Sequence, residues 1–175
     1  GDFNADGKAD LVVGASGYTS GTGRTYIFHN DGSIPTTAAT ADVTITGEGG
    51  EFGSSLATGD LNADGKTDLA VGAYAYSTYT GRAYIFYNDG SIPTTAATAD
   101  VTITGETTNS EFSRSLGSGD FNADGKIDLI VGAPRYSSYA GNTYIFYNGS
   151  IITENASGAD IIITGVNRFG YAIAV

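Results

Sequence analysis

The chain has 175 residues, which is enough for one domain with a sizeable core and too few for two large ones. It contains 26 glycines and 12 tyrosines but no cysteine, methionine or tryptophan, a composition that favours strands and tight turns and excludes disulfide bonds and thiolate metal sites. The formal net charge of −11 argues against a nucleic-acid surface and suits the binding of cations, and no apolar run approaches the roughly 20 residues that span a bilayer.

An eight-residue segment recurs three times along the chain. Gly-Asp-Phe-Asn-Ala-Asp-Gly-Lys begins at Gly1 and returns at Gly59, with Leu in place of Phe, and at Gly119. Residues 31–48 are also identical to residues 89–106. Repetition of this kind indicates one structural unit that is stacked several times. We therefore predict a single repeat domain, 1–175, with units at about 1–51, 52–111 and 112–168.

The second unit shows four strand candidates in chain order. Residues 54–59 are small and suit a crowded inner edge, whereas residues 68–73 are continuously apolar, which is typical of a strand covered on both faces. Residues 82–87 form a third candidate that ends at an Asn-Asp-Gly turn. Residues 100–104 alternate apolar with polar side chains, as in an outer strand with one wet face. Four strands in roughly 60 residues, with no helical pattern between them, predict the all-β blade of a β-propeller.

Short glycine motifs flank these strands in a regular order. They are Phe52-Gly53 and Phe169-Gly170 before an inner strand, Gly132-Ala133-Pro134 after a second strand, and the degenerate forms Gly14-Ala15-Ser16 and Gly72-Ala73-Tyr74. With an acidic loop between them, these motifs resemble the FG-GAP repeats of integrin α-chain propellers over essentially the whole chain. The resemblance implies three four-stranded antiparallel blades. Phe112-Ser113 departs from the pattern in the third unit and is expected to weaken that turn.

The acidic loops carry the chemistry. Each has the pattern Asp-x-Asn-x-Asp-Gly-x-x-Asp, which places oxygen donors at alternate positions while glycine frees the backbone at the bend. Hard oxygen ligands at this density are typical of calcium, so we expect three Ca2+ sites, each completed by the backbone carbonyl of a lysine whose side chain points to solvent. The predicted ligands are Asp2, Asn4, Asp6, Lys8 and Asp10 in the first loop, Asp60, Asn62, Asp64, Lys66 and Asp68 in the second, and Asp120, Asn122, Asp124, Lys126 and Asp128 in the third.

The residues that follow each loop distinguish it from helical calcium motifs. The twelfth positions are Val13, Val71 and Val131, where a helix-flanked calcium loop requires a bidentate glutamate. The apolar run from the ninth position also differs from dockerin-like modules, whose loops lead into helices. The alternative is an Asn- and Asp-rich turn that holds no metal. Three loops that share every ligand position favour structural calcium, which would tie the first strand of each hairpin to the second.

The two ends of the chain are in repeat phase. Residues 169–175 align with residues 112–118, and the segment that would come next matches the start of the chain. Because a propeller needs at least ~4 blades to close, three units leave an open edge. We expect residues 169–175, from this copy or another, to supply the inner strand of the first unit. Head-to-tail contact between copies would close a ring or extend a fibre, and the alternative is an excerpt from a longer propeller, in keeping with the missing initiator methionine.

Further candidate residues lie outside the loops. Tyr18, Tyr76 and Tyr136 occupy equivalent positions, with Tyr79 and Tyr139 close behind, and are expected to pack between blades, an aromatic platform for sugars being the alternative. Asn148-Gly149-Ser150 and Asn155-Ala156-Ser157 match the N-glycosylation pattern, and Thr36-Thr37 and Thr94-Thr95 are candidates for O-linked sugar, although plain turn residues explain both equally well.

An enzymatic activity is not expected. There is no cysteine, the single histidine, His29, stands where Tyr87 and Tyr147 occur in the other units, and Glu48 and Glu51 are explained by a solvated turn. The predicted function is a calcium-dependent adhesive or structural module at the cell surface or outside the cell. Its expected partners are further copies of the chain, an extracellular protein or a glycan. A carbohydrate-binding lectin and the accessory propeller of a larger surface enzyme are the alternatives.

Overall fold

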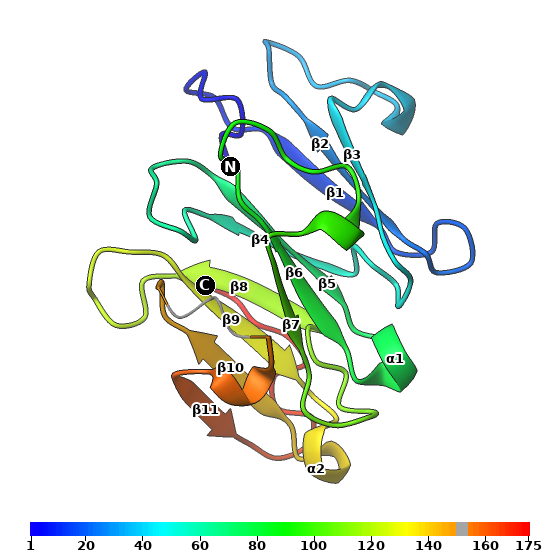
Figure 1. Ribbon diagram of the computed structural model, residues 1–175, viewed down its shortest axis with the longest axis vertical. Helices are drawn as coiled ribbons and strands as arrows, with labels where there is room; N and C mark the ends of the chain where they lie inside the picture. The colour runs from blue at the N-terminus through cyan, green and yellow to red at the C-terminus, as the bar shows by residue number, and fades with distance from the viewer. Residues whose placement is uncertain (150–153) are drawn as a thin grey trace.

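The structure is a computed structural model that describes residues 1–149 and 154–175. Three antiparallel sheets, called blades one to three, follow one another along the molecule (Figure 1). Blade one contains β1 (Leu11–Ala15), β2 (Arg24–Phe28) and β3 (Val43–Thr46). Blade two contains β4 (Ser55–Gly59), β5 (Asp68–Ala73), β6 (Arg82–Phe86) and β7 (Val101–Thr104). Blade three contains β8 (Ser115–Gly119), β9 (Asp128–Ala133), β10 (Asn142–Phe146) and β11 (Ile161–Thr164).

The order of strands within each sheet is the order along the chain. Blade two runs β4-β5-β6-β7, and each strand pairs antiparallel with the next. Its four strands begin and end within one residue of the four predicted from periodicity, so the all-β prediction is confirmed. The apolar strand β5 is buried along its whole length, whereas the alternating strand β7 is the outer strand, as expected.

The remaining elements are short. Three 3-10 turns, η1 (Ala38–Thr40), η2 (Ala96–Thr98) and η3 (Ala156–Gly158), precede the outer strands. Two four-residue turns, α1 (Tyr76–Tyr79) and α2 (Tyr136–Tyr139), connect the second and third strands of blades two and three. Ser77 and Thr78 have left-handed φ angles of 47° and 56°, so α1 is not a regular helix. In the described part of the chain, no helix is long and apolar enough to cross a membrane.

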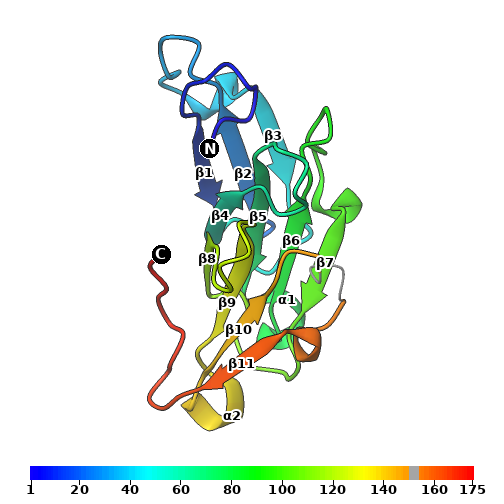
Figure 2. The same cartoon turned by 90° about the vertical axis from the view of Figure 1, so that its left-hand side faces the viewer.

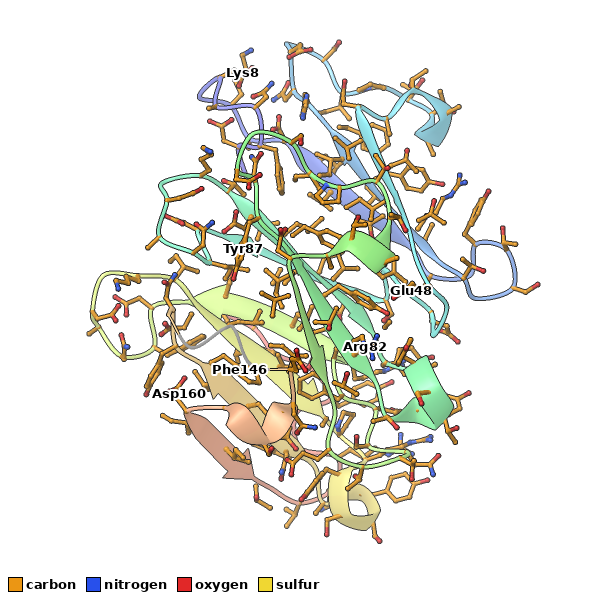
Figure 3. The ribbon with its side chains drawn as sticks, viewed as in Figure 1. Lys8, Glu48, Arg82, Tyr87, Phe146 and Asp160 are labelled. Carbon is orange, nitrogen blue, oxygen red and sulfur yellow. The ribbon has the colours of Figure 1, made fainter. Side chains whose placement is uncertain are left out.

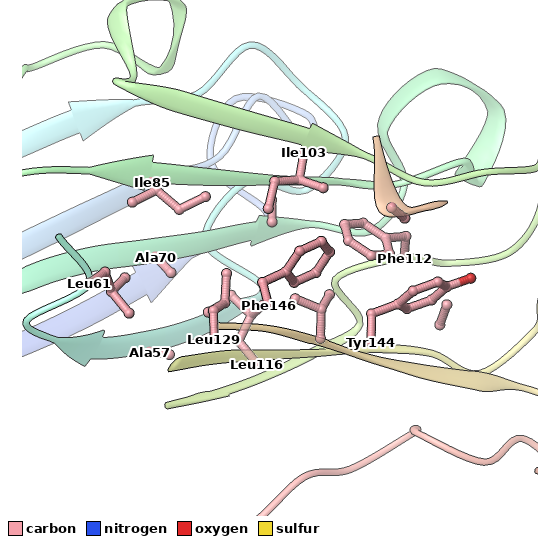
Figure 4. Close-up of a cluster of buried hydrophobic side chains, with 14 residues drawn as sticks. Ala57, Leu61, Ala70, Ile85, Ile103, Phe112, Leu116, Leu129, Tyr144 and Phe146 are labelled. Carbon is pink, nitrogen blue, oxygen red and sulfur yellow. The ribbon is translucent and has the colours of Figure 1, made fainter. Parts of the chain in front are cut away.

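Apolar side chains from neighbouring blades fill the space between them. Ile85 and Ile103 of blade two pack against Leu129 and Phe146 of blade three in one cluster, which Figure 4 shows in close-up. Phe112 lies in the same cluster, fully buried, with its ring edge-on to Tyr144 at 5.4 Å between centroids. Blades one and two share a second cluster of the same construction. The core is therefore a set of interfaces between sheets.

The motif that begins each inner strand makes a close backbone contact with the preceding blade. Gly53 has a φ of 89°, and a Cβ atom on Gly14 would collide with its carbonyl oxygen. In the third unit Ser113 takes the same left-handed conformation, with a φ of 66°. Its hydroxyl donates to the Arg82 carbonyl oxygen at 2.7 Å and accepts from the Ala73 amide at 3.1 Å. These two hydrogen bonds stabilise the left-handed conformation of Ser113, and a weaker turn at this position stays a prediction.

The C-terminal segment lies beside blade three. The Gly170 carbonyl oxygen accepts a hydrogen bond from the Ser115 hydroxyl at 2.7 Å, and Ile173 and Val175 lie against Gly117. Figure 2 shows this segment, in red, next to blade three, with the N-terminus at the other end of the row of blades. Among the described residues, blade one has three strands and residues 169–175 form none. In this copy the FG turn of the segment packs on β8 and β9 and the segment does not pair with β1, so completion of blade one by another copy stays a prediction.

Candidate metal centres

The three acidic loops lie along one edge of the row of blades, at the left in Figure 1. The first precedes β1, the second joins β4 to β5, and the third joins β8 to β9. All three have the same backbone turn. Ala5, Ala63 and Ala123 have φ angles of 58°, 61° and 61°, and the glycine two residues later is also left-handed in each loop. The repeated sequence therefore folds into a repeated geometry.

The first and third positions of each loop are brought together. In the first loop the Asp2 and Asn4 side-chain oxygens both accept from the backbone amide of Asp6, at 3.2 and 3.1 Å. The second loop repeats this arrangement at Asp64, with distances of 2.9 and 3.0 Å, and the third at Asp124, with 3.1 and 2.9 Å. Two oxygens that converge on one amide lie close to each other, as two ligands of a shared cation would.

The ninth position holds the most buried carboxylate of each loop. Asp68 is fully buried, and its two oxygens accept from the Leu61 and Asn88 backbone amides, both at 2.8 Å. The pKa of Asp68 is raised, because the effect of burial exceeds the opposite effect of those two hydrogen bonds. Asp10 and Asp128 accept from the equivalent amides. This carboxylate therefore joins its acidic loop to the end of β2, β6 or β10, through one oxygen each.

The fifth position pairs with the lysine of the same loop. Lys8 Nζ lies 3.0 Å from Asp6 Oδ2, and Lys66 Nζ lies 3.7 Å from Asp64 Oδ2. The hydrogen bond from Lys8 lowers the pKa of Asp6, and the same contact raises the pKa of Lys8. All three loop lysines are exposed, as expected of side chains that point to solvent, and Lys8 and Lys66 also contact the fifth-position carboxylate of their own loop. A cation in the loop would compete with the lysine for that carboxylate.

The donor set fits calcium, although the carboxylates are not gathered around one point. In residues 1–149 and 154–175, no three acidic, histidine or cysteine side chains are placed closely enough to hold a metal ion. The carboxylate at position five turns to its lysine in the first two loops, and the carboxylate at position nine accepts from backbone amides. The oxygens at positions one and three nevertheless converge in all three loops, and carboxylate and amide oxygens are the ligands that calcium prefers. Three bound ions would draw on the fifteen residues predicted from the sequence, five in each loop.

An asparagine links each of the first two loops to the next blade. Asn88 follows β6, and its side-chain amide donates to the Phe3 carbonyl oxygen in the first loop at 2.8 Å. Asn148 makes a similar bond at 3.0 Å to the carbonyl oxygen of Asp60, which stands one residue earlier in the second loop. Sequence reasoning treated Asn88 as part of a tight turn and Asn148 as a glycosylation candidate. Their recurrence could have been noticed, because Asn30, Asn88 and Asn148 each stand 20 residues after the ninth position of a loop.

The other candidate residues have structural roles. Tyr76 and Tyr136 pack against the two apolar clusters, as expected of tyrosines that cover loop bases. Glu48 and Glu51 do not form a pair, since each accepts a hydrogen bond from a different tyrosine, Tyr84 or Tyr74.

The glycosylation candidates have local roles where the structure describes them. Ser150 of the first pattern lies outside the described residues. The side-chain amide of Asn148 is used in the link to the second acidic loop, and Asn155 accepts from the Ser157 amide at 3.0 Å as the cap of η3.

Blades that stack face to face, with an acidic loop on one edge of each, define a protein of the β-propeller class. A family model described as "FG-GAP repeat" matches residues 1–28, 52–86 and 112–146. The chain belongs to the FG-GAP repeat family.

Similar proteins are much longer than this chain. Phosphatidylinositol-glycan-specific phospholipase D from Bos taurus is 34% identical over 97% of this chain but only 23% of its own length. Integrin alpha-6 from Gallus gallus is 37% identical over 73% of this chain and 12% of its own length. Integrin alpha-IIb from Mus musculus is 37% identical over 79% of this chain and 14% of its own length. The chain therefore spans less than a quarter of each of these relatives.

Proposed function

We propose that the chain is a non-enzymatic calcium-binding blade array that acts outside the cell or at its surface as an adhesive or structural module. The observation that carries the proposal is the convergence of two side-chain oxygens on one amide in each of three loops with the same backbone. The acidic balance of the chain supports it, because each divalent ion would cancel two of its excess negative charges. Extracellular calcium modules bind in the range of roughly 0.1 to 1 mM, which suits a cell-surface location.

Calcium would stiffen the array through contacts that the loops already make. A ligated loop would hold the Phe3 carbonyl oxygen in place for Asn88, and the Asp60 carbonyl oxygen for Asn148. Because those asparagines belong to the following blade, ordering one loop would also fix the angle between two blades. The proposed role of the ion is therefore structural, and the surfaces that bind partners would be presented by the rigid array.

The experiment is a thermal melt of the chain in calcium and in excess chelator. Calcium at about a hundred times its dissociation constant is expected to stabilise the chain by about 2.7 kcal/mol per site. Asp60→Asn removes a predicted ligand and should weaken one site in a calcium titration. Asp89→Asn, which changes the same charge in the exposed turn after β6, is the matched control and should leave all sites intact. An unchanged melt in chelator would contradict the proposal.

Assembly through the two end faces is a second function that a specific observation favours. Leu69 and Val71 of β5 are fully buried against blade one, whereas their equivalents in β1, Leu11 and Val13, are 43% and 40% exposed. The exposed face of blade one therefore corresponds to the face that, in blades two and three, is covered by the preceding blade.

The opposite end presents the other half of the same contact. Ile103 of β7 is fully buried against blade three, but its equivalent in β11, Ile163, is 41% exposed. Both stand opposite the second residue of the preceding strand, Ala83 or Thr143. We propose that a second copy of the chain packs its blade one on blade three, in the head-to-tail geometry that is already repeated inside the molecule.

Complementation between two variants tests this contact. Leu11→Lys with Val13→Lys removes one face, and Ile161→Lys with Ile163→Lys removes the other. Each variant alone should be monomeric by light scattering, and an equal mixture should form one-to-one dimers, because each partner keeps one intact face. A parent chain that stays monomeric at high concentration would overturn the assembly proposal and point to further repeats of a longer polypeptide on these faces.

A further inference from the structure

The cationic side chains are sorted between the two edges of the molecule. The three lysines all stand in the acidic loops. The five arginines, Arg24, Arg82, Arg114, Arg135 and Arg168, stand at or near the strand ends on the other edge. Figure 3 shows this separation, with Lys8 at the loop edge and Arg82 across the molecule from it. A chain with a net charge of −11 thus carries a concentration of positive charge along one edge.

Three of those arginines share one cavity. It has a volume of about 270 Å3 and lies where blades two and three meet the C-terminal segment. Arg114, Arg135 and Arg168 line it together with Tyr74, Tyr171 and a single carboxylate, Glu111. Three guanidinium groups against one carboxylate make this cavity electropositive. Its volume suits a small ligand or one charged group of a larger ligand.

Aromatic rings hold the guanidinium groups without neutralising them. The Arg114 guanidinium carbon lies 4.2 Å from the centroid of Tyr74 and 5.2 Å from that of Tyr171. The Tyr139 ring is shared by Arg135, at 5.3 Å, and Arg168, at 5.1 Å. Such stacking orients an arginine while leaving its fork of N–H donors available.

The charges of the cavity are incompletely paired. Arg135 Nε lies 3.1 Å from Glu111 Oε1, whereas Arg114 and Arg168 have no carboxylate at ion-pairing distance among the described residues. An Arg114 N–H instead donates to the Tyr171 hydroxyl at 3.1 Å. This hydrogen bond and the nearby positive charge lower the pKa of the Tyr171 phenol. On the Tyr74 side of the cavity, burial and the hydrogen bond to Glu51 raise the pKa of Tyr74, so the excess positive charge lies on the Tyr171 side.

The fold does not require these arginines. The backbone that carries them is repeated one blade earlier, where Ser54 stands for Arg114 and Ala75 for Arg135. Ser54 N donates to the Glu51 carbonyl oxygen at 3.1 Å, as Arg114 N does to that of Glu111 at 3.0 Å. Likewise, Ala75 N donates to the Gly50 carbonyl oxygen at 3.0 Å, and Arg135 N to that of Ser110 at 3.1 Å. Small side chains thus suffice for the same backbone, so packing does not account for Arg114. Arg135 in addition pairs with the buried Glu111.

We propose that this cavity binds a small tetrahedral oxyanion, a phosphate or sulfate group, between Arg114, Arg135 and Arg168. Guanidinium forks match the oxygens of such groups and bind them through charge-assisted hydrogen bonds. The tyrosine hydroxyl groups beside them supply further donors, and the rings offer a face to the organic part of a monoester. The site lies on the edge opposite the calcium loops and does not depend on them.

Titration calorimetry with inorganic phosphate and inorganic sulfate tests the proposal, in calcium and against sodium chloride of matched ionic strength. Saturable one-to-one binding is expected. Arg114→Ser and Arg135→Ala install the residues that the chain itself uses one blade earlier, and each should weaken binding about tenfold, or about 1.4 kcal/mol. The matched control is Arg82→Asn, which places the blade-three residue Asn142 in blade two and removes one charge from the same edge but outside the cavity.

The outcomes separate a site from general attraction to positive charge. Binding that Arg82→Asn leaves within twofold, while the cavity variants lose it, supports the proposal, and phenyl phosphate compared with phenyl sulfate then identifies the preferred ester. Equal losses in all three variants, or no saturable binding in the parent chain, would overturn it. Arg168→Gln, at an exposed position, is the second variant if a cavity variant does not fold.

Discussion

The two edges of the blade row rest on the same strands, yet only one of them is repeated in its side chains. The acidic edge carries the same residues, the same left-handed turns and the same hydrogen bonds in every unit. The arginine edge carries one backbone conformation with different side chains at each junction, Ser54 in one and Arg114 in the next. The repeated acidic residues are therefore assigned to the structure of every unit. Arg114 stands where Ser54 has the same backbone, so it is assigned to a role that the fold does not require.

The largest expected effect comes from the scaffold beneath both edges. Phe112→Ala should cost about 3 to 5 kcal/mol, because the ring is fully buried against Tyr144 and leaves a cavity. Phe169→Ala changes the equivalent residue of the C-terminal segment, which is 40% exposed, and should cost much less. Denaturant unfolding followed by circular dichroism measures both. Similar losses would show that the last FG turn is as well packed as the internal ones.

Within the acidic edge, the ninth position should matter more than the fifth. Asp128→Asn removes a buried carboxylate that accepts from the Phe121 and Asn148 amides, and in chelator it should cost about 2 kcal/mol. Asp124→Asn, in the exposed part of the same loop, is the control and should change stability little without metal. Both should weaken calcium binding. Equal stability in chelator would mean that the buried carboxylate has no structural role of its own.

Replacing Arg114 on the arginine edge should cost less stability than replacing a buried aspartate on the acidic edge. Arg114→Ser is expected to cost about 1 kcal/mol or less, the worth of a partly exposed cation–π contact, because the first junction already uses serine. Arg135→Ala also removes the ion-pair partner of the buried Glu111 and should cost more. The melting temperature in calcium checks this. A loss from Arg114→Ser as large as that of Asp128→Asn would show that Arg114 holds the junction together.

The smallest expected effect is a change in the titration of one tyrosine. The hydrogen bond and charge of Arg114 lower the pKa of Tyr171, so this phenol should ionise below the ordinary tyrosine range. Burial raises the pKa of Tyr84 and Tyr144 far above that range, so they should remain protonated until the chain unfolds. Nuclear magnetic resonance during an alkaline titration distinguishes them. Arg114→Ser should return Tyr171 to the ordinary range and leave Tyr84 unchanged.

Much of the fold was predictable because it depends on patterns among residues that are close together in the sequence. The strand limits of blade two followed from apolar periodicity and turn residues, and both act over a few neighbouring positions. The convergence of Asp2 and Asn4 was also local, since the loop closes within ten residues. The bridge from Asn88 to the Phe3 carbonyl oxygen joins residues 85 positions apart and was missed. The position of the C-terminal segment beside blade three also depends on contacts between distant residues. The alignment of residues 169–175 with residues 112–118 does not reveal which blade the segment contacts.

The sequence by itself determined the repeat unit, the four-strand blade and the three sets of oxygen donors, because each depends on side chains and backbone preferences within one short stretch of chain. The tertiary structure alone decided that asparagines tie loops to the next blade, and that Arg114, Arg135 and Arg168 line one cavity. Those three arginines come from three separate connections, and only the stacking of blades, driven by burial of their apolar faces, brings them together.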